Sequence, residues 1–255
     1  MIDYFLVLAL ILFFYMNLWF IVSLLRKRND VADEAWGFGF VVLAWASFLL
    51  GTAQDTRGII VGILVSIWGT RLAWHIFRRH LGHSEDYRYA KWREDWGKWF
   101  YVRSYVQVYL LQGVLLFLIA TPILLINQSA GVSLNYLDGI GIFMWIVGFV
   151  FEVVGDAQLA QFKKDPHNKG KLLQTGLWNY SRHPNYFGEV LQWWGVFVLA
   201  LSVSNGWFGI VGPLMITFLI LKVSGIPLLE KKMMENPAFA EYQKKTSIFI
   251  PWFPK

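Results

Sequence analysis

The chain has no cysteine and few charged residues. Of its 255 residues only 16% are charged, whereas a soluble domain usually carries about a quarter. The lack of cysteine excludes disulfides, thiol nucleophiles and cysteine metal ligands. The shortage of charge, together with 56% hydrophobic residues in long runs, excludes an ordinary soluble domain and indicates an integral membrane protein.

The sequence also lacks linkers, repeats and known nucleotide fingerprints. No Pro/Gly-rich or low-complexity segment divides it, so we expect residues 1–255 to form a single integral membrane domain. No G-x-G-x-x-G stretch follows a strand-like run, so a dinucleotide would have to lie among helices and loops. We expect no metal site, because His80 and His83 form a loop pair without further ligands nearby.

The long apolar runs predict an all-α fold, a polytopic membrane bundle of about seven transmembrane helices. A spanning helix needs roughly 20 mostly apolar residues. The first run is too long for a signal peptide and lacks a basic flank before it, so we expect a retained helix. The candidate spans are 2–25, 35–52, 58–77, 102–126, 137–159, 187–205 and 207–228.

Lysine and arginine gather at one end of these spans. Basic clusters follow the first, third, fifth and seventh spans, whereas the opposite loops contain only Arg57. This positive-inside pattern predicts an N-terminus outside and a C-terminus in the cytoplasm. Because the net charge of +6 lies beside apolar spans, we expect membrane lipids as partners and no nucleic acid.

Ionisable residues within the predicted spans indicate a buried polar site, because such groups are costly in a bilayer. Arg71, His75, Arg78 and Arg79 share roughly one face of the third span. Each has a structural alternative: the last two suit snorkelling at the membrane edge, and Arg71 suits a structural ion pair. The possible acidic partners lie four residues apart in the fifth span, at Glu152 and Asp156.

The most specific segment is 176–189, Gly-Leu-Trp-Asn-Tyr-Ser-Arg-His-Pro-Asn-Tyr-Phe-Gly-Glu. It resembles the C-terminal signature of the steroid 5-alpha-reductase family, in a superfamily shared with sterol reductases and isoprenylcysteine carboxyl methyltransferases. The resemblance is strongest over 140–255 and includes the Phe-Glu-Val-Val-Gly-Asp run ending at Asp156. It implies an uncharacterised bacterial branch of the family, in the inner membrane, with NADPH-dependent oxidoreductase activity on CH-CH groups.

The resemblance also implies a cofactor site. The aspartate, asparagine and glutamate of the family fall on Asp156, Asn185 and Glu189, and its third-helix arginine falls on Arg71. A carboxamide or carboxylate can bond the nicotinamide amide and fix the ring face that delivers hydride. The many cations suit phosphates and favour NADPH, with NADH as the alternative. The expected cofactor-binding residues are Arg71, Arg78, Arg79, Asp156, Lys163, Lys164, Arg182, His183, Asn185, Tyr186, Glu189 and Glu230.

Two residues are expected to be catalytic. Steroid-reducing relatives bind the enone carbonyl with a glutamate of the second helix, which falls in the region of Glu34, and a tyrosine of the third. The tyrosine position falls on Trp68, which has no hydroxyl, so His75 is the expected replacement acid. The substrate expected from this resemblance is a lipophilic, steroid-like or other lipid enone that enters from the bilayer. Structural alternatives are a helix N-terminal carboxylate for Glu34 and a carbonyl-bonded neutral imidazole for His75.

Two other functions stay open. An Arg-His-Pro-x-Tyr-x-Gly core is shared with methyltransferases of the superfamily, which use S-adenosylmethionine, whereas the reductases continue as Asn-Tyr-x-Gly-Glu, as Asn185 to Glu189 do. A lipid-binding or scaffold module without enzymatic activity is the third reading. It predicts that substitutions at Asn185 and Glu189 alter only stability.

Overall fold

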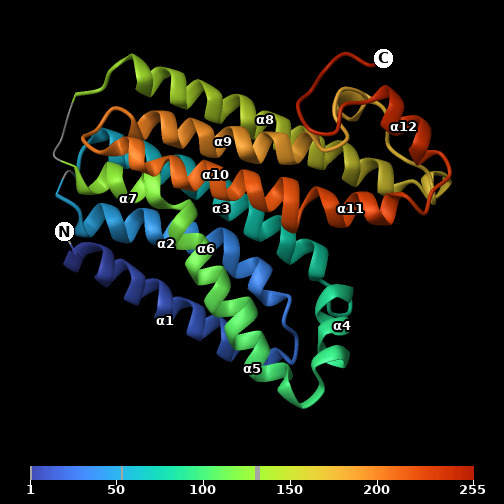
Figure 1. The fold of residues 1–255 in the computed structure, drawn as a ribbon, viewed down its shortest axis with the longest axis horizontal. Coiled ribbons are helices and arrows are strands. Elements are labelled where there is room, and N and C mark those ends of the chain that lie inside the picture. Colours follow the sequence, from blue (N-terminus) through green and yellow to red (C-terminus); the bar gives the residue numbers. More distant parts are fainter. Residues whose placement is uncertain (1, 53, 130–132) are drawn as a thin grey trace. The chain divides into compact units, whose positions relative to one another are not determined.

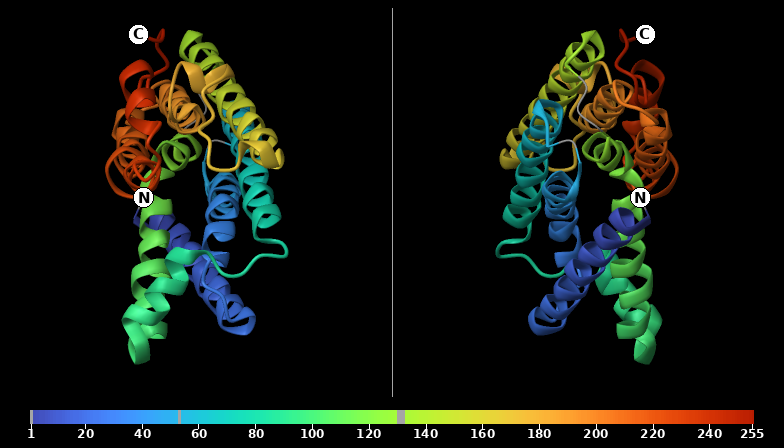
Figure 2. Two further views of the ribbon diagram at one scale, coloured as in Figure 1. Left: turned by 90° about the vertical axis from the view of Figure 1, so that its right-hand side faces the viewer. Right: turned by 90° about the vertical axis from the view of Figure 1, so that its left-hand side faces the viewer.

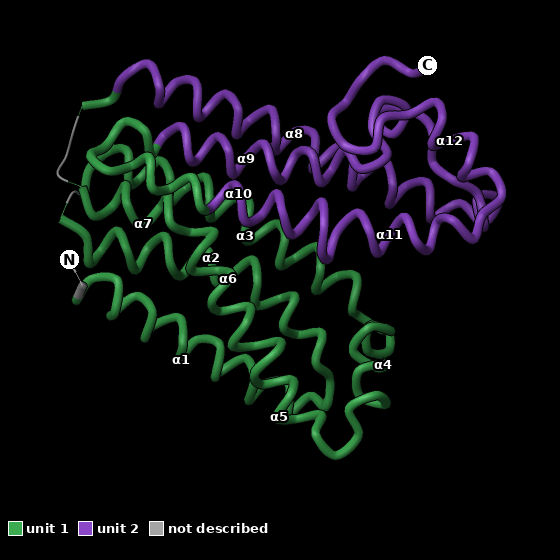
Figure 3. Tube along the Cα trace, viewed as in Figure 1, with its two compact units in different colours: residues 1–134, 200–211 green, residues 135–199, 212–255 purple. Residues whose placement is uncertain are grey.

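The computed structural model describes residues 2–52, 54–129 and 133–255, and this part of the chain is nearly all helical (Figure 1). Within these residues, β pairing is confined to an isolated bridge between Ser181 and Ser247. The predicted all-α class is therefore confirmed. The chain separates into two compact units, residues 1–134 with 200–211 and residues 135–199 with 212–255 (Figure 3). That residues 1–255 form one membrane domain stays a prediction.

The first unit is built around the antiparallel neighbours α2 and α3, which run side by side (Figure 2). They approach closely at Gly37 and Gly69, where a Cβ on Gly37 would lie 2.5 Å from the Gly69 carbonyl oxygen. Close to these glycines in the sequence, Phe40 and Trp68 pack edge to face with ring centroids 5.4 Å apart. The elements of the unit are α1 (Ile2–Arg26), α2 (Val31–Leu50), α3 (Thr56–His80), α4 (Tyr87–Trp96), η1 (Gly97–Trp99), α5 (Phe100–Ser104), η2 (Tyr105–Leu110), α6 (Leu111–Ile119), α7 (Thr121–Gln128) and η5 (Gly206–Ile210).

The predicted helix over 102–126 is interrupted at Ala120. Pro122 stands in the first turn of α7, and a proline has no N–H to continue the ladder of the preceding helix. The hydroxyl of Thr121 donates to the Leu118 carbonyl at 2.8 Å, which satisfies an oxygen at the end of α6. The break is therefore a consequence of one proline and one local cap.

The second unit is built around α8 and α9, which lie side by side (Figure 1). Glycines from the two helices face one another, Gly141 against Gly195 and Gly148 against Gly188, so the backbones are in contact. Such small-residue seams permit close helix packing in membranes. The elements are α8 (Tyr136–Lys164), η3 (Pro166–Asn168), η4 (Gly176–Asn179), α9 (Pro184–Ala200), α10 (Val211–Phe218), η6 (Leu219–Val223), α11 (Ile226–Met233) and α12 (Phe239–Lys245).

Six helical stretches among the described residues are long and apolar enough to cross a membrane, which fits a multi-pass integral membrane protein. A seventh predicted span falls on α9, which has 17 residues and a length of about 26 Å. The number of spans and the orientation of the termini stay predictions. The six stretches are Asp3–Arg26, Val31–Leu50, Thr56–His80, Tyr87–Ile119, Tyr136–Lys164 and Gly206–Met233.

Candidate functional site

Charged side chains join the turn before α2 to the turn before α4 in the first unit. Asp30, fully buried at the N-cap of α2, accepts hydrogen bonds from Arg28 at 2.7 and 2.8 Å and from the Asp86 amide at 2.9 Å. Burial raises the pKa of Asp30, but these bonds outweigh burial and hold its pKa below the ordinary value. Asp30 is therefore held ionised, and its carboxylate connects the two turns through these hydrogen bonds.

Two further carboxylates strengthen this connection. Asp33 accepts from Arg88 at 3.0 Å and from the hydroxyl of Tyr89 at 2.6 Å. Glu85 pairs with Arg93 at 3.0 Å. We call the set formed by these groups the first polar cluster. It comprises Arg28, Asp30, Asp33, Glu34, His80, Glu85, Asp86, Arg88, Tyr89 and Arg93.

Glu34, the predicted catalytic carboxylic acid, lies in this cluster and is 6% exposed. Its Oε1 is 3.3 Å from Nδ1 of His80, whose Nε2 is 3.9 Å from Asp30. His80 thus stands between two buried carboxyl groups, a role that the sequence did not indicate. The prediction that His80 is a loop residue beside His83 was wrong, because α3 continues to His80. Among the described residues, no group of three or more histidine, aspartate or glutamate side chains is arranged to hold a metal ion.

The predicted residues of the third helix are spread from the interior to the surface of α3. Arg71 and His75 are half-buried, whereas Arg78 and Arg79 are exposed. The Arg78 guanidinium lies over the ring of Trp74, 5.9 Å from its centroid. Exposed arginines suit both snorkelling and phosphate binding, so both readings persist.

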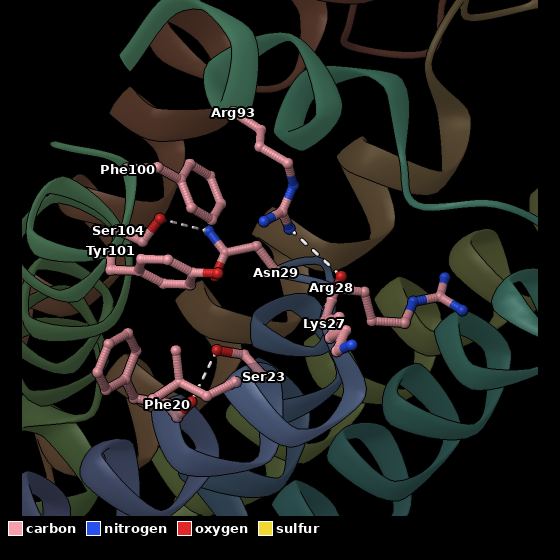
Figure 4. A pocket seen from close by; sticks show the side chains of 10 residues that line it. Phe20, Ser23, Lys27, Arg28, Asn29, Arg93, Phe100, Tyr101 and Ser104 are labelled. Atoms are coloured by element: carbon pink, nitrogen blue, oxygen red, sulfur yellow. Dashed lines mark hydrogen bonds between the residues drawn. The ribbon is translucent and has the colours of Figure 1, made fainter. Parts of the chain in front are cut away.

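A small pocket with a volume of about 10 Å³ lies beside the first polar cluster. Figure 4 shows Asn29 donating to the hydroxyl of Ser104, and Arg93 reaching the carbonyl of Lys27. Two of the cations in its wall are neutralised, Arg28 by Asp30 and Arg93 by Glu85. Ligand pockets usually measure about 300–1,000 Å³, so this one is too small for a dinucleotide.

Polar side chains also gather along the contact of α8 and α9 in the second unit. The amide of Asn185 donates to Asp156 at 3.0 Å, and the amide of Gln192 donates to Glu152 at 2.6 Å. Glu152 and Gln192 are buried, and Oε1 of Gln192 has no hydrogen-bond partner among the described residues. With the half-buried Glu189, these residues form the second polar cluster. Gln192 was not predicted, although it follows Glu189 by about one helical turn.

Arg182 and His183, both predicted to bind cofactor, are buried in this unit. Arg182 donates to Glu230 at 2.8 Å and to the Thr246 carbonyl at 2.7 Å, and Nε2 of His183 is 3.3 Å from the same carboxylate. The main-chain amide of Arg182 donates to the Ser247 carbonyl at 2.8 Å. These contacts connect the loop before α9 to the C-terminal segment. The charge of Arg182 is already compensated by Glu230.

The remaining predicted residues of the second unit lie nearer the surface. The Tyr186 ring stacks on the His183 ring with centroids 5.8 Å apart. Lys163 and Lys164 end α8 and are exposed. Arg71, Arg78 and Arg79 belong to the other unit. Convergence of the basic and acidic sets on one cofactor therefore stays a prediction.

Helices long and apolar enough to cross a membrane, two of which carry the buried carboxylates Glu34 and Glu152, fit a multi-pass integral membrane protein. The chain belongs to the family described as Protein of unknown function (DUF1295), which matches residues 19–246. An uncharacterized protein of Schizosaccharomyces pombe is 25% identical over 90% of this chain and 74% of its own length. No solved structure matches.

The chain is also related, at low identity, to steroid 5-alpha-reductases. It is 25% identical to 3-oxo-5-alpha-steroid 4-dehydrogenase 1 of Rattus norvegicus over 114 residues, 44% of this chain and 40% of that enzyme. The match thus spans about two fifths of the length of this relative. A probable O-methyltransferase, ustE of Ustilaginoidea virens, is 40% identical over 73 residues, 28% of this chain and 26% of that protein.

Proposed function

We propose that the protein is a membrane-embedded NAD(P)H-dependent reductase that transfers hydride to the conjugated carbon–carbon double bond of a lipophilic enone. The observation that carries this proposal is the hydrogen-bonded pair of Asp156 and Asn185 between α8 and α9. Both residues are positions at which the steroid-reductase resemblance implies cofactor contact. The similarity to the rat steroid dehydrogenase supports the same reaction class.

The donor and acceptor groups of the second polar cluster fit a nicotinamide carboxamide. A carboxamide has N–H donors and one carbonyl acceptor. The unpartnered, buried Oε1 of Gln192 can accept one of its N–H groups, and the amide of Asn185 can donate to its oxygen if it leaves Asp156. Exposed Lys163 and Lys164 can serve phosphates, and the many cations favour NADPH over NADH. Arg182 is less suited to phosphate binding, because Glu230 already neutralises it.

The bound cofactor would supply hydride to the β-carbon of the enone. The chain itself would stabilise the carbonyl oxygen as it gains enolate charge, and a proton from solvent would then add to the α-carbon to complete the reduction. Glu34, held beside His80, and His75 are the two residues assigned to stabilise this oxygen. Groups of this kind typically contribute about 10²–10³ in rate. The substrate reaches the site from the bilayer, and the protein resides in the bacterial inner membrane.

Cofactor choice tests the proposal. Protein purified in detergent should unfold at a higher temperature with NADPH than without it, and an enone such as progesterone should then drive NADPH oxidation. Asn185→Ala should lose the thermal shift. Gln161→Ala is the matched control, because Gln161 is an exposed amide on α8. Absence of any effect of NADPH and NADH would exclude the proposal.

The alternative function is an S-adenosylmethionine-dependent lipid or prenyl methyltransferase, which the match to the probable O-methyltransferase favours. S-adenosylhomocysteine distinguishes the two functions. Thermal stabilisation by S-adenosylhomocysteine, without stabilisation by either dinucleotide, would support the transferase. Stabilisation by a dinucleotide alone would support the reductase.

A further inference from the structure

The C-terminal segment of the second unit borders a groove whose described lining includes Arg182 but no other residue assigned above. The groove has a volume of about 390 Å³, which is within the usual range of ligand pockets. No aspartate or glutamate is among the described residues that line it. The lining is Arg182, Gln243, Lys244, Lys245, Thr246, Ser247, Ile248, Trp252, Phe253 and Lys255.

Three lysines give the groove its charge. Lys244 and Lys245 end α12, and Lys255 reaches the end of α12 through a hydrogen bond from its amide to the Lys245 carbonyl at 3.0 Å. All three side chains are exposed. Because Arg182 is neutralised by Glu230, these lysines supply the uncompensated positive charge. A ligand that suits the groove therefore carries negative charge.

Large apolar side chains stand exposed beside these lysines. Ile248, Ile250 and Trp252 are 46%, 62% and 69% exposed, and they alternate with Phe249, which packs on Phe187 at 5.8 Å between centroids. Their exposure leaves an apolar surface beside the lysines. Phe253, 78% exposed, continues this apolar surface. Exposed aromatic and aliphatic groups next to lysine are typical of segments that lie in the membrane interface.

The position along the chain supports a membrane ligand. The last spanning candidate ends at Met233, and α12 begins only six residues later at Phe239. The groove therefore lies within a short chain distance of a membrane surface. Trp252 is fixed there by a hydrogen bond from its amide to the Tyr180 carbonyl at 3.0 Å, so the apolar side is presented by a held segment.

We propose that this groove binds the phosphate-bearing headgroup of an anionic phospholipid, with Lys244, Lys245 and Lys255 around the phosphate. Ile248, Ile250 and Trp252 would enter the boundary between headgroups and acyl chains. Juxtamembrane lysines interact favourably with anionic headgroups. The occupant is a lipid rather than a soluble nucleotide because the charged and apolar parts of the surface adjoin, as they do in a phospholipid.

A single labelled cysteine can report this binding, because the natural sequence has none. Full-length protein with Ile250→Cys, labelled with bimane, is placed in nanodiscs of phosphatidylcholine with or without phosphatidylglycerol. Phosphatidylglycerol should shift bimane emission to the blue, and spin-labelled phosphatidylglycerol should quench it. A label at His167→Cys, whose side chain is 91% exposed, should not respond.

Charge variants complete the test. The triple change Lys244→Gln, Lys245→Gln and Lys255→Gln should reduce the preference for phosphatidylglycerol by roughly fivefold per lysine, with an unchanged unfolding temperature. Its matched control carries the same charge change at exposed lysines outside the groove, at Lys169, Lys171 and Lys231.

Three outcomes would overturn the proposal. They are an equal response in phosphatidylcholine, an unchanged preference in the groove variant, and an equal response to NADPH or inorganic pyrophosphate, which would identify a soluble-phosphate site. The readout needs no enzymatic turnover, so it is independent of the reductase proposal.

Discussion

Nδ1 of His80 lies 3.3 Å from Oε1 of Glu34, and both side chains are buried. The last residue of α3 thereby holds a carboxyl group in the first turn of α2. A buried polar group that loses its partner is costly, so His80→Ala should destabilise the protein by about 1–3 kcal/mol. The free energy of unfolding in mixed micelles measures this loss.

A double-mutant cycle isolates the contact itself. Glu34→Gln and His80→Ala should show a coupling energy of about 0.5–3 kcal/mol, as residues in direct contact do. His83→Ala is the control, because His83 is exposed and bonds the nearby Leu81 carbonyl. Coupling of Glu34 to His83 as strong as to His80 would refute the contact.

Enzymatic assays separate His75 from His80. If Glu34 stabilises the enolate oxygen, Glu34→Gln should lower kcat/KM by about 10²–10³. His75→Ala should cause a comparable loss if His75 is the second acid, whereas His80→Ala should cause a smaller loss of kcat/KM, because His80 contacts Glu34 and is not assigned to the substrate. Full activity in both Glu34→Gln and His75→Ala would end the assignment of these two residues as catalytic.

Acid sensitivity should follow from Asp30 and Asp86. Burial opposes ionisation of both, but hydrogen bonds from Arg28 and Arg88, respectively, and from backbone amides keep each pKa below the ordinary value of 3.8. Because the folded pKa values are lowered, the carboxylates stabilise the fold above about pH 4, and this stability is lost as pH falls through the folded pKa values. Asp30→Asn should flatten the loss of stability below pH 4, as measured by unfolding temperature against pH. An unchanged slope would contradict the prediction.

The sequence predicted the positions of the long helices well, because each of these helices coincides with a separate run of apolar residues. Every predicted span overlaps a helix or a run of helices, and Glu34 does lie in the first turn of α2. The break at Ala120 was missed, although Pro122 was its visible cause. Local signals of this kind can be read from one sequence.

The first polar cluster was harder to foresee. Its long-range contacts join residues that are 46 to 56 positions apart, as His80 with Glu34 and Asp30 with the Asp86 amide. Such pairs depend on the α1–α2 and α3–α4 turns being neighbours, which helical periodicity does not encode. Periodicity grouped Arg71, His75, Arg78 and Arg79 on one face, but it did not identify which histidine meets Glu34.

The trio of Arg182, His183 and Glu230 should control the C-terminal segment. Glu230→Gln removes the charge that compensates Arg182, and we expect a loss of about 1–3 kcal/mol and faster tryptic cleavage at Lys244 and Lys245. Glu235→Gln is the matched control, since Glu235 is exposed a turn and a half further on. Cleavage at the wild-type rate in Glu230→Gln would show that other contacts hold the segment.

The glycine seam of α8 and α9 supports the second polar cluster, because it sets the distance between the helices that carry Asp156 and Asn185. A Cβ at Gly148 would lie 2.5 Å from the Gly188 carbonyl oxygen and 2.8 Å from the Gln192 amide nitrogen. Both neighbours are backbone atoms that can move only if the helices separate. Gly148→Ala should therefore destabilise the protein by about 1–3 kcal/mol, as overpacking usually does.

The same helix provides the control. A Cβ at Gly139 meets nothing within 4 Å, so Gly139→Ala should be neutral or stabilising by up to about 1 kcal/mol, because alanine favours the helix over glycine. Unfolding temperatures compare the two variants. Gly148→Ala should also weaken nicotinamide dinucleotide binding, whereas Gly139→Ala should not, because only the former shifts Asn185 relative to Asp156. Equal stability and equal binding in both variants would mean that the seam does not position the cluster.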